Sequence, residues 1–178
     1  MSGFEHHVGR WAAASVANCL LPLGAGSGFI VDLTAKITAI RSMTPEQVDI
    51  IRKSFDAMWP MRGDIADLCY SRFFELAPDA KDLFRSDMER QRFKLMDMIA
   101  ALVGSLDQRA LFQSLATQSG RQHARFGVRP SHYDALGEAL MFSLERKFGA
   151  SFTPELRASW SALYAAVQVE MLRAGATP

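Results

Sequence analysis

The chain has 178 residues, of which 49% are hydrophobic and 22% are charged, and its formal net charge at pH 7 is +1. This length supports one domain with a full hydrophobic core, and the composition is that of a soluble globular protein. A nearly neutral charge without a basic stripe argues against nucleic acid as a partner. Cys19 and Cys69 lie in apolar surroundings without metal-type spacing, which predicts buried thiols in a reducing, cytoplasmic compartment rather than a disulfide.

The segment before Met43 differs in character from the rest of the chain. Residues 11–31 carry no charge, but one proline and several glycines interrupt them, which argues against a membrane span. A signal peptide is the alternative, although Glu5 lies within its weakly positive start. We therefore expect residues 1–42 to be a peripheral or flexible extension, or an upstream start wrongly assigned to the gene. The functional domain is expected at residues 43–178.

The first predicted helix begins directly after this extension. Thr44 and Gln47 form a capping box and Pro45 suits the first helical position, so the motif predicts a helix that ends at Pro60. From here on the apolar spacing is helical, and no segment alternates with period two for long enough to make a strand. The domain is therefore expected to be all-α.

Five further helices are predicted along the chain, with starts near Gly63, Met88, Leu111, Ser131 and Thr153. Between the second and third helices, PDAKDLF is expected to form a short helical fragment that carries Phe84 into the interior. Gly127 can close the fourth helix. Ser131, with Asp134 three residues later, resembles a capping box at the start of the fifth helix.

The fourth helix places an imidazole on its apolar face. Steps of three and four residues lead from Phe112 through Ala116 and Ser119 to His123, and on to Phe126. A buried polar ring needs a partner, so His123 is a candidate ligand. A core histidine satisfied by its neighbours is the alternative.

Two further polar residues lie on faces that are expected to be buried. Gln91 stands one turn before Leu95 on the third helix, and Tyr70 lies near Phe73 and Phe74 on the second. Three polar groups from three helices can therefore face one interior. The alternatives are that Gln91 is an exposed residue early in its helix and that Tyr70 is a core aromatic with its hydroxyl at the edge.

Four short motifs carry these residues in order: CYSRFFELAPDAKDLF with Tyr70 and Phe84, QRFKLM with Gln91 and Leu95, GRQHARFGV with His123, and HY with Tyr133. Their order and spacing resemble those of the bacterial single-domain globins, a group similar to the haem domain of flavohaemoglobins. The resemblance covers about residues 44–171. It implies a three-on-three globin fold around haem b, with an N-terminal extension.

The resemblance also implies a role for each residue. His123 is expected to be the proximal iron ligand with Tyr133 beside it, and Phe84 to wedge against the porphyrin. Tyr70 and Gln91 are expected to form the distal polar pair. Further haem contacts are expected from Phe74, Lys94, Leu95, Phe126, Val128 and Leu136. The cations Arg92, Lys94, Arg121 and Arg125 are candidates to meet the haem propionates, and surface charge is the alternative for each.

Physical chemistry gives these roles a reason. A neutral imidazole binds haem iron through one nitrogen, while the other can donate to a backbone carbonyl in the preceding helical turn. A hydroxyl or amide donor aimed at bound dioxygen makes a hydrogen bond worth about 1.5 to 3 kcal/mol. Since Tyr70 and Gln91 are two such donors, we expect slow loss of the gas.

One position departs from the flavohaemoglobin pattern. That family has a glutamate late in its last helix that hydrogen-bonds near the proximal histidine and tyrosine. Counting from Trp160 places Ala174 or Gly175 at this position, and Glu170 falls about one turn too early. We therefore expect weaker electron donation toward the iron, which counts against peroxidase-like chemistry.

The resemblance implies a haem protein that reversibly binds dioxygen and other diatomic gases, such as nitric oxide or carbon monoxide, at a His-ligated iron. One alternative is nitric oxide dioxygenation, in which Tyr70 and Gln91 steady the intermediate and a separate reductase restores ferrous iron. Another is a haem-based gas sensor that signals through the segment before Met43. A helical regulatory or scaffold module without haem is the fourth.

Overall fold

The computed structural model describes residues 43–84 and 87–176, and all regular structure within these residues is helical. The six α-helices are α2 (Pro45–Met58), α3 (Arg62–Leu76), α4 (Met88–Gly104), α5 (Arg109–Arg125), α6 (Pro130–Phe148) and α7 (Pro154–Gly175). Three short 3-10 helices connect them: η2 (Trp59–Met61), η3 (Pro78–Leu83) and η4 (Gly149–Ser151). The predicted all-α fold is confirmed. The predicted extension and Cys19 lie outside the described residues, whereas Cys69 is buried as expected.

Most helix ends follow the signals in the sequence. The Thr44 hydroxyl accepts from the Gln47 N–H at 3.3 Å, and the Gln47 side chain accepts from the Thr44 N–H at 3.0 Å, which confirms the capping box of α2. Thr153 caps α7 by accepting from the Leu156 N–H at 3.2 Å. Gly127 follows α5 with a φ of 77°, a conformation that favours glycine.

One predicted cap is wrong. α6 begins at Pro130 rather than at Ser131, and its N-cap is Arg129. Pro130 brings the fixed φ of a first helical residue, so Ser131 already lies inside the first turn. Instead of a contact between Ser131 and Asp134, the Nδ1 atom of His132 accepts from the Arg129 backbone N–H at 3.2 Å.

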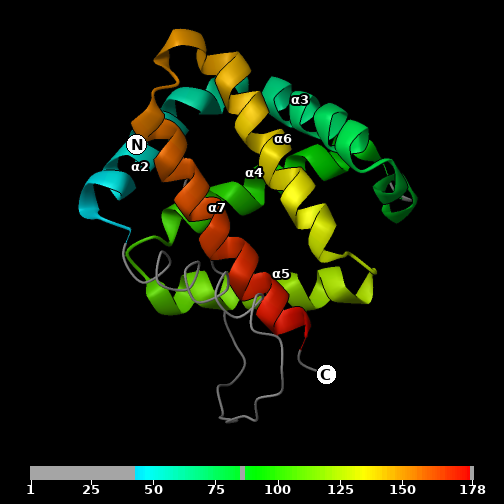
Figure 1. Cartoon of the computed structure of the whole chain (residues 1–178). Coiled ribbons are helices and arrows are strands. Elements are labelled where there is room, and N and C mark those ends of the chain that lie inside the picture. Colours follow the sequence, from blue (N-terminus) through cyan, green and yellow to red (C-terminus); the bar gives the residue numbers. More distant parts are fainter. Residues whose placement is uncertain (1–42, 85–86, 177–178) are drawn as a thin grey trace, which may run out of the picture.

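Two pairs of helices make the most extensive contacts, α5 with α7 and α3 with α6. In Figure 1, α6 and α7 run diagonally with α4 behind them, and α5 lies along the lower edge. One face of α7 is apolar and buried along its length, at Leu156, Trp160, Leu163, Val167 and Met171. α7 is also tied to α2, because Trp160 Nε1 donates to Ser54 Oγ at 2.9 Å.

Two aromatic side chains are exposed, Phe93 by 56% and Phe126 by 71%, although Phe126 was expected on a buried face. Phe126 follows the last residue of α5, so the helical stepping that placed it on the face of His123 no longer applies there. Phe93 lies in the first two turns of α4, where no side chain is fully buried. The apolar stripe of α4 becomes covered only from Met96 onward.

The crossing of α5 and α7 brings two backbones into direct contact. A Cβ atom at Gly120 would lie 2.2 Å from the backbone oxygen of Met171, so only glycine fits at this point. A Cβ atom at Gly175 would likewise lie 3.1 Å from Ala124 Cβ. The last turns of α5, which carry His123, are therefore held firmly against α7.

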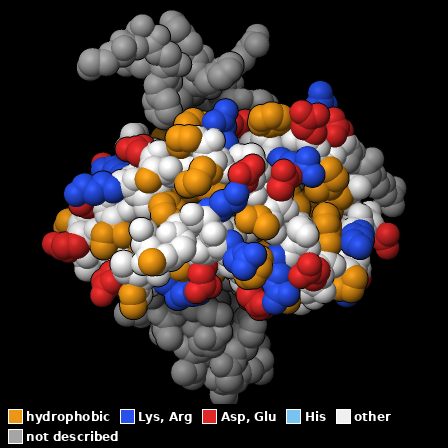
Figure 2. Space-filling model, turned by 90° about the horizontal axis from the view of Figure 1, so that it is seen from above, with side chains coloured by type: hydrophobic (Ala, Val, Ile, Leu, Met, Phe, Trp, Pro, Cys, Tyr) orange, Lys and Arg blue, Asp and Glu red, His pale blue; other side chains and the backbone are white. Residues whose placement is uncertain are grey.

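The surface is mixed in charge. On the face shown in Figure 2, acidic, basic and hydrophobic side chains are interspersed, and neither sign of charge gathers into one large area. This agrees with the formal net charge of +1. Among the helices that the structure describes, none has the length and apolar character needed to cross a membrane.

Candidate functional site

His123 lies in the last turn of α5, and its own helix orients its ring. The Nδ1 atom lies 2.7 Å from the backbone oxygen of Ser119, one turn earlier. Because a carbonyl can only accept, Nδ1 carries the hydrogen and Nε2 keeps its lone pair. No side chain or backbone group of residues 43–84 and 87–176 is hydrogen-bonded to Nε2. The predicted hydrogen bond from one ring nitrogen to a carbonyl of the preceding turn is present, and the second ring nitrogen is available.

The surroundings of His123 also favour the form that binds metals. Burial lowers the pKa of His123 below its ordinary value of 6.5, and the hydrogen bond to Ser119 partly opposes this shift. The ring is consequently neutral at neutral pH. A neutral imidazole with a lone pair on Nε2 is the form that coordinates haem iron.

Tyr133, on the first turn of α6, lies beside His123. The two ring centroids are 5.9 Å apart and the ring planes differ by 35°. Burial raises the pKa of Tyr133 to about 12, so its hydroxyl stays protonated at neutral pH. The structure therefore brings together the two residues that were predicted to share one side of the site.

Tyr164 on α7 holds the part of α6 that carries Tyr133. Its hydroxyl donates to the backbone oxygen of Tyr133 at 2.6 Å. Its ring occupies the space beside Gly137, where a Cβ atom would lie 2.5 Å from the ring. The sequence analysis missed Tyr164. The sequence does place Tyr164 next to Leu163 on a helix with a buried face. A tyrosine in such a position usually finds a hydrogen-bond partner for its hydroxyl, which could have marked it as a positioning residue.

An aromatic cluster joins α3 to the end of η3. The ring of Phe84 meets Tyr70 at a centroid distance of 5.5 Å and Phe74 at 5.2 Å, both edge to face. Phe73 joins the cluster at 6.1 Å from Phe84. Such edge-to-face pairs are favourable beyond the area they bury. The half-buried Phe84 thus packs against the core as the sequence predicted.

The hydroxyl of Tyr70 reaches α4. It donates to the backbone oxygen of Gln91 at 3.4 Å, which is long for a hydrogen bond and therefore weak. Burial raises the pKa of Tyr70, so the group is a neutral donor at neutral pH. The structure brings Tyr70 and Gln91 together, although the contact is to the backbone of Gln91 rather than to its amide.

The other predicted site residues fall into two groups. Half-buried side chains that pack against the core are those of Phe74, Leu95, Val128 and Leu136. Exposed side chains are those of Lys94 and Phe126, together with Arg121 and Arg125. Arg92 differs from these cations, because it forms an ion pair with Asp67 on α3.

Glu170 faces the opposite end of α5 from His123. The residue is 7% exposed, and its carboxylate accepts from Gln113 Nε2 at 3.4 Å and from Arg173 Nη2 at 2.6 Å. Gln113 lies several helical turns before His123. The α7 residue that approaches Ala124, the neighbour of His123, is Gly175, which has no carboxylate.

Together the fold and the site define a helical protein with one available imidazole nitrogen on α5 and a buried tyrosine contact between α3 and α4. Within the described part of the chain, no three His, Cys, Asp or Glu side chains converge as a metal site. An iron held by a porphyrin needs only one protein ligand. A single imidazole on a helix is a donor that haem iron can use.

The comparisons with known proteins agree with this class. The sequence pattern of the family described as Globin matches residues 67–171, which is more than half of the chain. The chain belongs to the globin family. The matched range includes Tyr70, Gln91, His123 and Tyr133.

Three curated relatives give the range of similarity. Neuroglobin from Tetraodon nigroviridis is 26% identical over 148 residues, which cover 75% of this chain and 93% of that protein. Flavohemoprotein from Vibrio cholerae is 27% identical over 125 residues, 68% of this chain and 32% of that protein. Flavohemoprotein from Bacillus subtilis is 23% identical over 123 residues, which cover 67% of this chain and 31% of that protein. The chain thus spans about a third of these two flavohemoproteins.

We predict that Tyr164→Phe lowers the free energy of unfolding by about 1 kcal/mol, because the Tyr133 carbonyl loses the Tyr164 hydroxyl as a donor and keeps only its helical one. The matched control is Tyr133→Phe, which removes a hydroxyl that has no hydrogen bond to the described residues and should cost less than about 0.5 kcal/mol. Urea unfolding followed by far-UV circular dichroism measures both. Equal losses in the two variants would show that the Tyr164 contact does not hold α6.

Proposed function

We propose that this chain binds haem b with His123 as the proximal iron ligand, and that it reversibly binds dioxygen and other diatomic gases there. The observation that carries the proposal is the orientation of His123, whose Nδ1–H is bonded to the Ser119 oxygen at 2.7 Å while Nε2 is available. Membership of the globin family supports haem-based gas binding. The narrower resemblance to bacterial single-domain globins remains a prediction.

Each side chain then has a defined task. When bound, the haem supplies ferrous iron with a coordination position for a diatomic gas. His123 holds the group from α5, and Tyr133 packs beside its ring. Apolar contacts to the haem come from Phe74, Phe84, Leu95, Val128 and Leu136, and we also assign contacts to Phe126 and to Lys94, the latter near the propionates.

Tyr70 and Gln91 act on the gas side. The Tyr70 hydroxyl is a neutral donor whose present bond to the Gln91 backbone, at 3.4 Å, is weak. It can therefore exchange this acceptor for a bound gas that carries partial negative charge. The amide of Gln91 is a second donor on α4. Two donors favour slow release of dioxygen over rapid exchange.

We assign the haem-binding domain to residues 43–178 and regard residues 1–42 as an extension. The helices from Pro45 to Gly175 and the family match at residues 67–171 support this division. Burial raises the pKa of the Cys69 thiol to about 12, which keeps it protonated and unreactive. Such a reduced, buried thiol agrees with a cytoplasmic location.

Nitric oxide dioxygenation is a second candidate function. It is favoured by the contact between Tyr70 and Gln91 and by similarity to two proteins named flavohemoprotein. The reaction also needs a reductase as partner to restore ferrous iron. Nitric oxide consumption with a supplied reductant separates the candidates: repeated turnover per haem supports catalysis, and a single stoichiometric burst supports binding alone.

We predict that His123→Gly abolishes the histidine-ligated spectrum of the ferrous haem protein, and that added imidazole restores it by entering the space left by the side chain. The control is Gln122→Ala at the exposed neighbouring position, which should leave the spectrum unchanged. Absorption spectra with and without carbon monoxide measure the effect. A glycine variant that keeps the parent spectrum without imidazole contradicts the proposed ligation, and a parent without a Soret band after haem addition contradicts haem binding.

We predict that Tyr70→Phe speeds dioxygen dissociation about tenfold, because one hydrogen bond of about 1.5 kcal/mol to the bound gas is lost. The substitution keeps the ring packing against Phe74 and Phe84. Stopped-flow replacement of dioxygen by carbon monoxide gives the rate. An unchanged rate would place the tyrosine away from the gas.

A further inference from the structure

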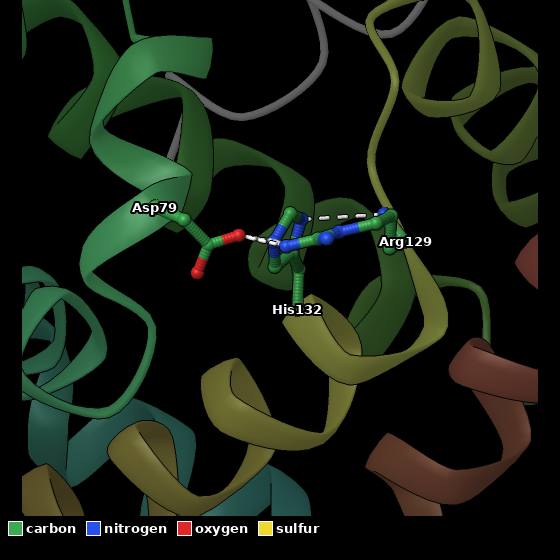
Figure 3. A network of polar contacts seen from close by, with 3 residues as sticks. All are labelled: Asp79, Arg129 and His132. Atoms are coloured by element: carbon green, nitrogen blue, oxygen red, sulfur yellow. Dashed lines mark hydrogen bonds and ion pairs between the residues drawn. The ribbon is translucent and has the colours of Figure 1, made fainter.

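A network of three polar side chains joins η3 to the start of α6 (Figure 3). His132 is 4% exposed, and its Nε2 atom lies 2.9 Å from an Asp79 carboxylate oxygen. Its Nδ1 atom accepts from the backbone N–H of Arg129 at 3.2 Å. The Arg129 guanidinium forms an ion pair with the same carboxylate and lies 3.0 Å from Nε2. One buried ring is therefore attached both to the N-cap of α6 and to η3.

The contacts of His132 with the Arg129 backbone and with the Asp79 carboxylate are both satisfied by one protonation state of the ring. The backbone N–H of Arg129 can only donate, so Nδ1 must keep its lone pair. The carboxylate of Asp79 can only accept, so Nε2 must carry the hydrogen. A second proton on Nδ1 would point one donor at another and break the contact with the N-cap. The neutral ring with its hydrogen on Nε2 therefore satisfies the backbone contact and the Asp79 contact together, while the nearby Arg129 guanidinium, which can only donate, pairs with Asp79 rather than with Nε2.

The two charged groups around His132 oppose each other, because the Arg129 guanidinium disfavours a protonated ring and the Asp79 carboxylate favours one. The charged groups that face it among the described residues are Asp79 on η3 and Arg129 at the start of α6. Burial and the positive charge of Arg129 lower the pKa of His132 below its ordinary value of 6.5. The stabilisation that follows is present above pH 6.5 and is lost as the pH falls toward the lowered pKa.

The network connects the two parts of the candidate site. His132 directly precedes Tyr133, whose ring lies against His123. η3 directly precedes Phe84, whose ring lies against Tyr70. The first turn of α6 therefore carries both His132 and the ring that lies against the imidazole on α5.

We propose that His132 is a positioning residue that holds Tyr133 against His123, and that protonation of His132 releases the first turn of α6 and changes the environment of His123. The effect on iron rests on the proposed haem ligation by His123. The network itself is formed by protein groups alone, so it can be tested with and without haem.

Two substitutions separate the contacts of the ring. In His132→Asn the amide oxygen takes the place of Nδ1 and can accept from Arg129, whereas the contact with Asp79 is lost. In His132→Gln the amide nitrogen takes the place of Nε2 and can donate to Asp79, whereas the cap of α6 is lost. Neither side chain titrates between pH 5 and 8.

The first test is hydrogen exchange of the amides at residues 129–134 in the haem-free and haem-loaded full chain. At about pH 7.5 we expect exchange in His132→Gln to be about fivefold faster than in the parent, since one hydrogen bond is lost, and His132→Asn to stay closer to the parent. After correction for intrinsic rates, acidification to about pH 5.5 should accelerate exchange in the parent and in neither variant. Protection that follows pH equally in all three proteins overturns the proposal.

The second test is the midpoint potential of the haem-loaded chain as a function of pH. We expect the parent to show a change as the pH falls below 6.5 that both variants lack, because only the parent titrates at His132. Identical profiles in the three proteins overturn the link from His132 to His123. A chain that takes up no haem overturns the proposed function instead, and exchange in the haem-free chain then decides the positioning of Tyr133.

Discussion

The hydrogen bond from His123 Nδ1–H to the Ser119 oxygen is the interaction on which the site depends. It uses a carbonyl of the same helix, so the direction of the ring follows from the backbone of α5. That backbone is in turn held in place, because Gly120 lets α5 approach the Met171 backbone of α7 more closely than any side chain would permit. The available Nε2 lone pair is thus a property of the helix packing, and one ring nitrogen is committed before any cofactor binds.

The surrounding residues support this ring from α6 and α7. Tyr133 packs beside it, and the Tyr164 hydroxyl and the His132 network each fix the chain next to Tyr133. Burial raises the pKa of Tyr70 and Tyr133 and lowers that of His123, so all three side chains are neutral at neutral pH. A site of neutral donors and one neutral imidazole agrees with the proposed binding of a gas that acquires only partial charge.

Local interactions are the part of this structure that could be predicted from the sequence. The cap at Thr44, the buried stripe of α7 and the contact between His123 and Ser119 all join residues within a few turns of one another. The contacts of Tyr164 with Tyr133 and of His132 with Asp79 join segments that are far apart in the chain, and neither has a periodic signal. The exposed position of Phe126 was missed because helical periodicity stops where α5 ends.

The most direct measurement of the central claim is resonance Raman spectroscopy of the gas-free ferrous protein, prepared with ordinary and with ¹⁵N-labelled histidine. The chain has four histidines, and the account assigns iron ligation to one of them. It predicts an iron–nitrogen stretching band that shifts on labelling in the parent and persists when His132 is replaced by Asn. Two results would contradict ligation by His123. One is a parent spectrum without a label-sensitive band, and the other is a band that survives replacement of His123 by Gly when no imidazole is added.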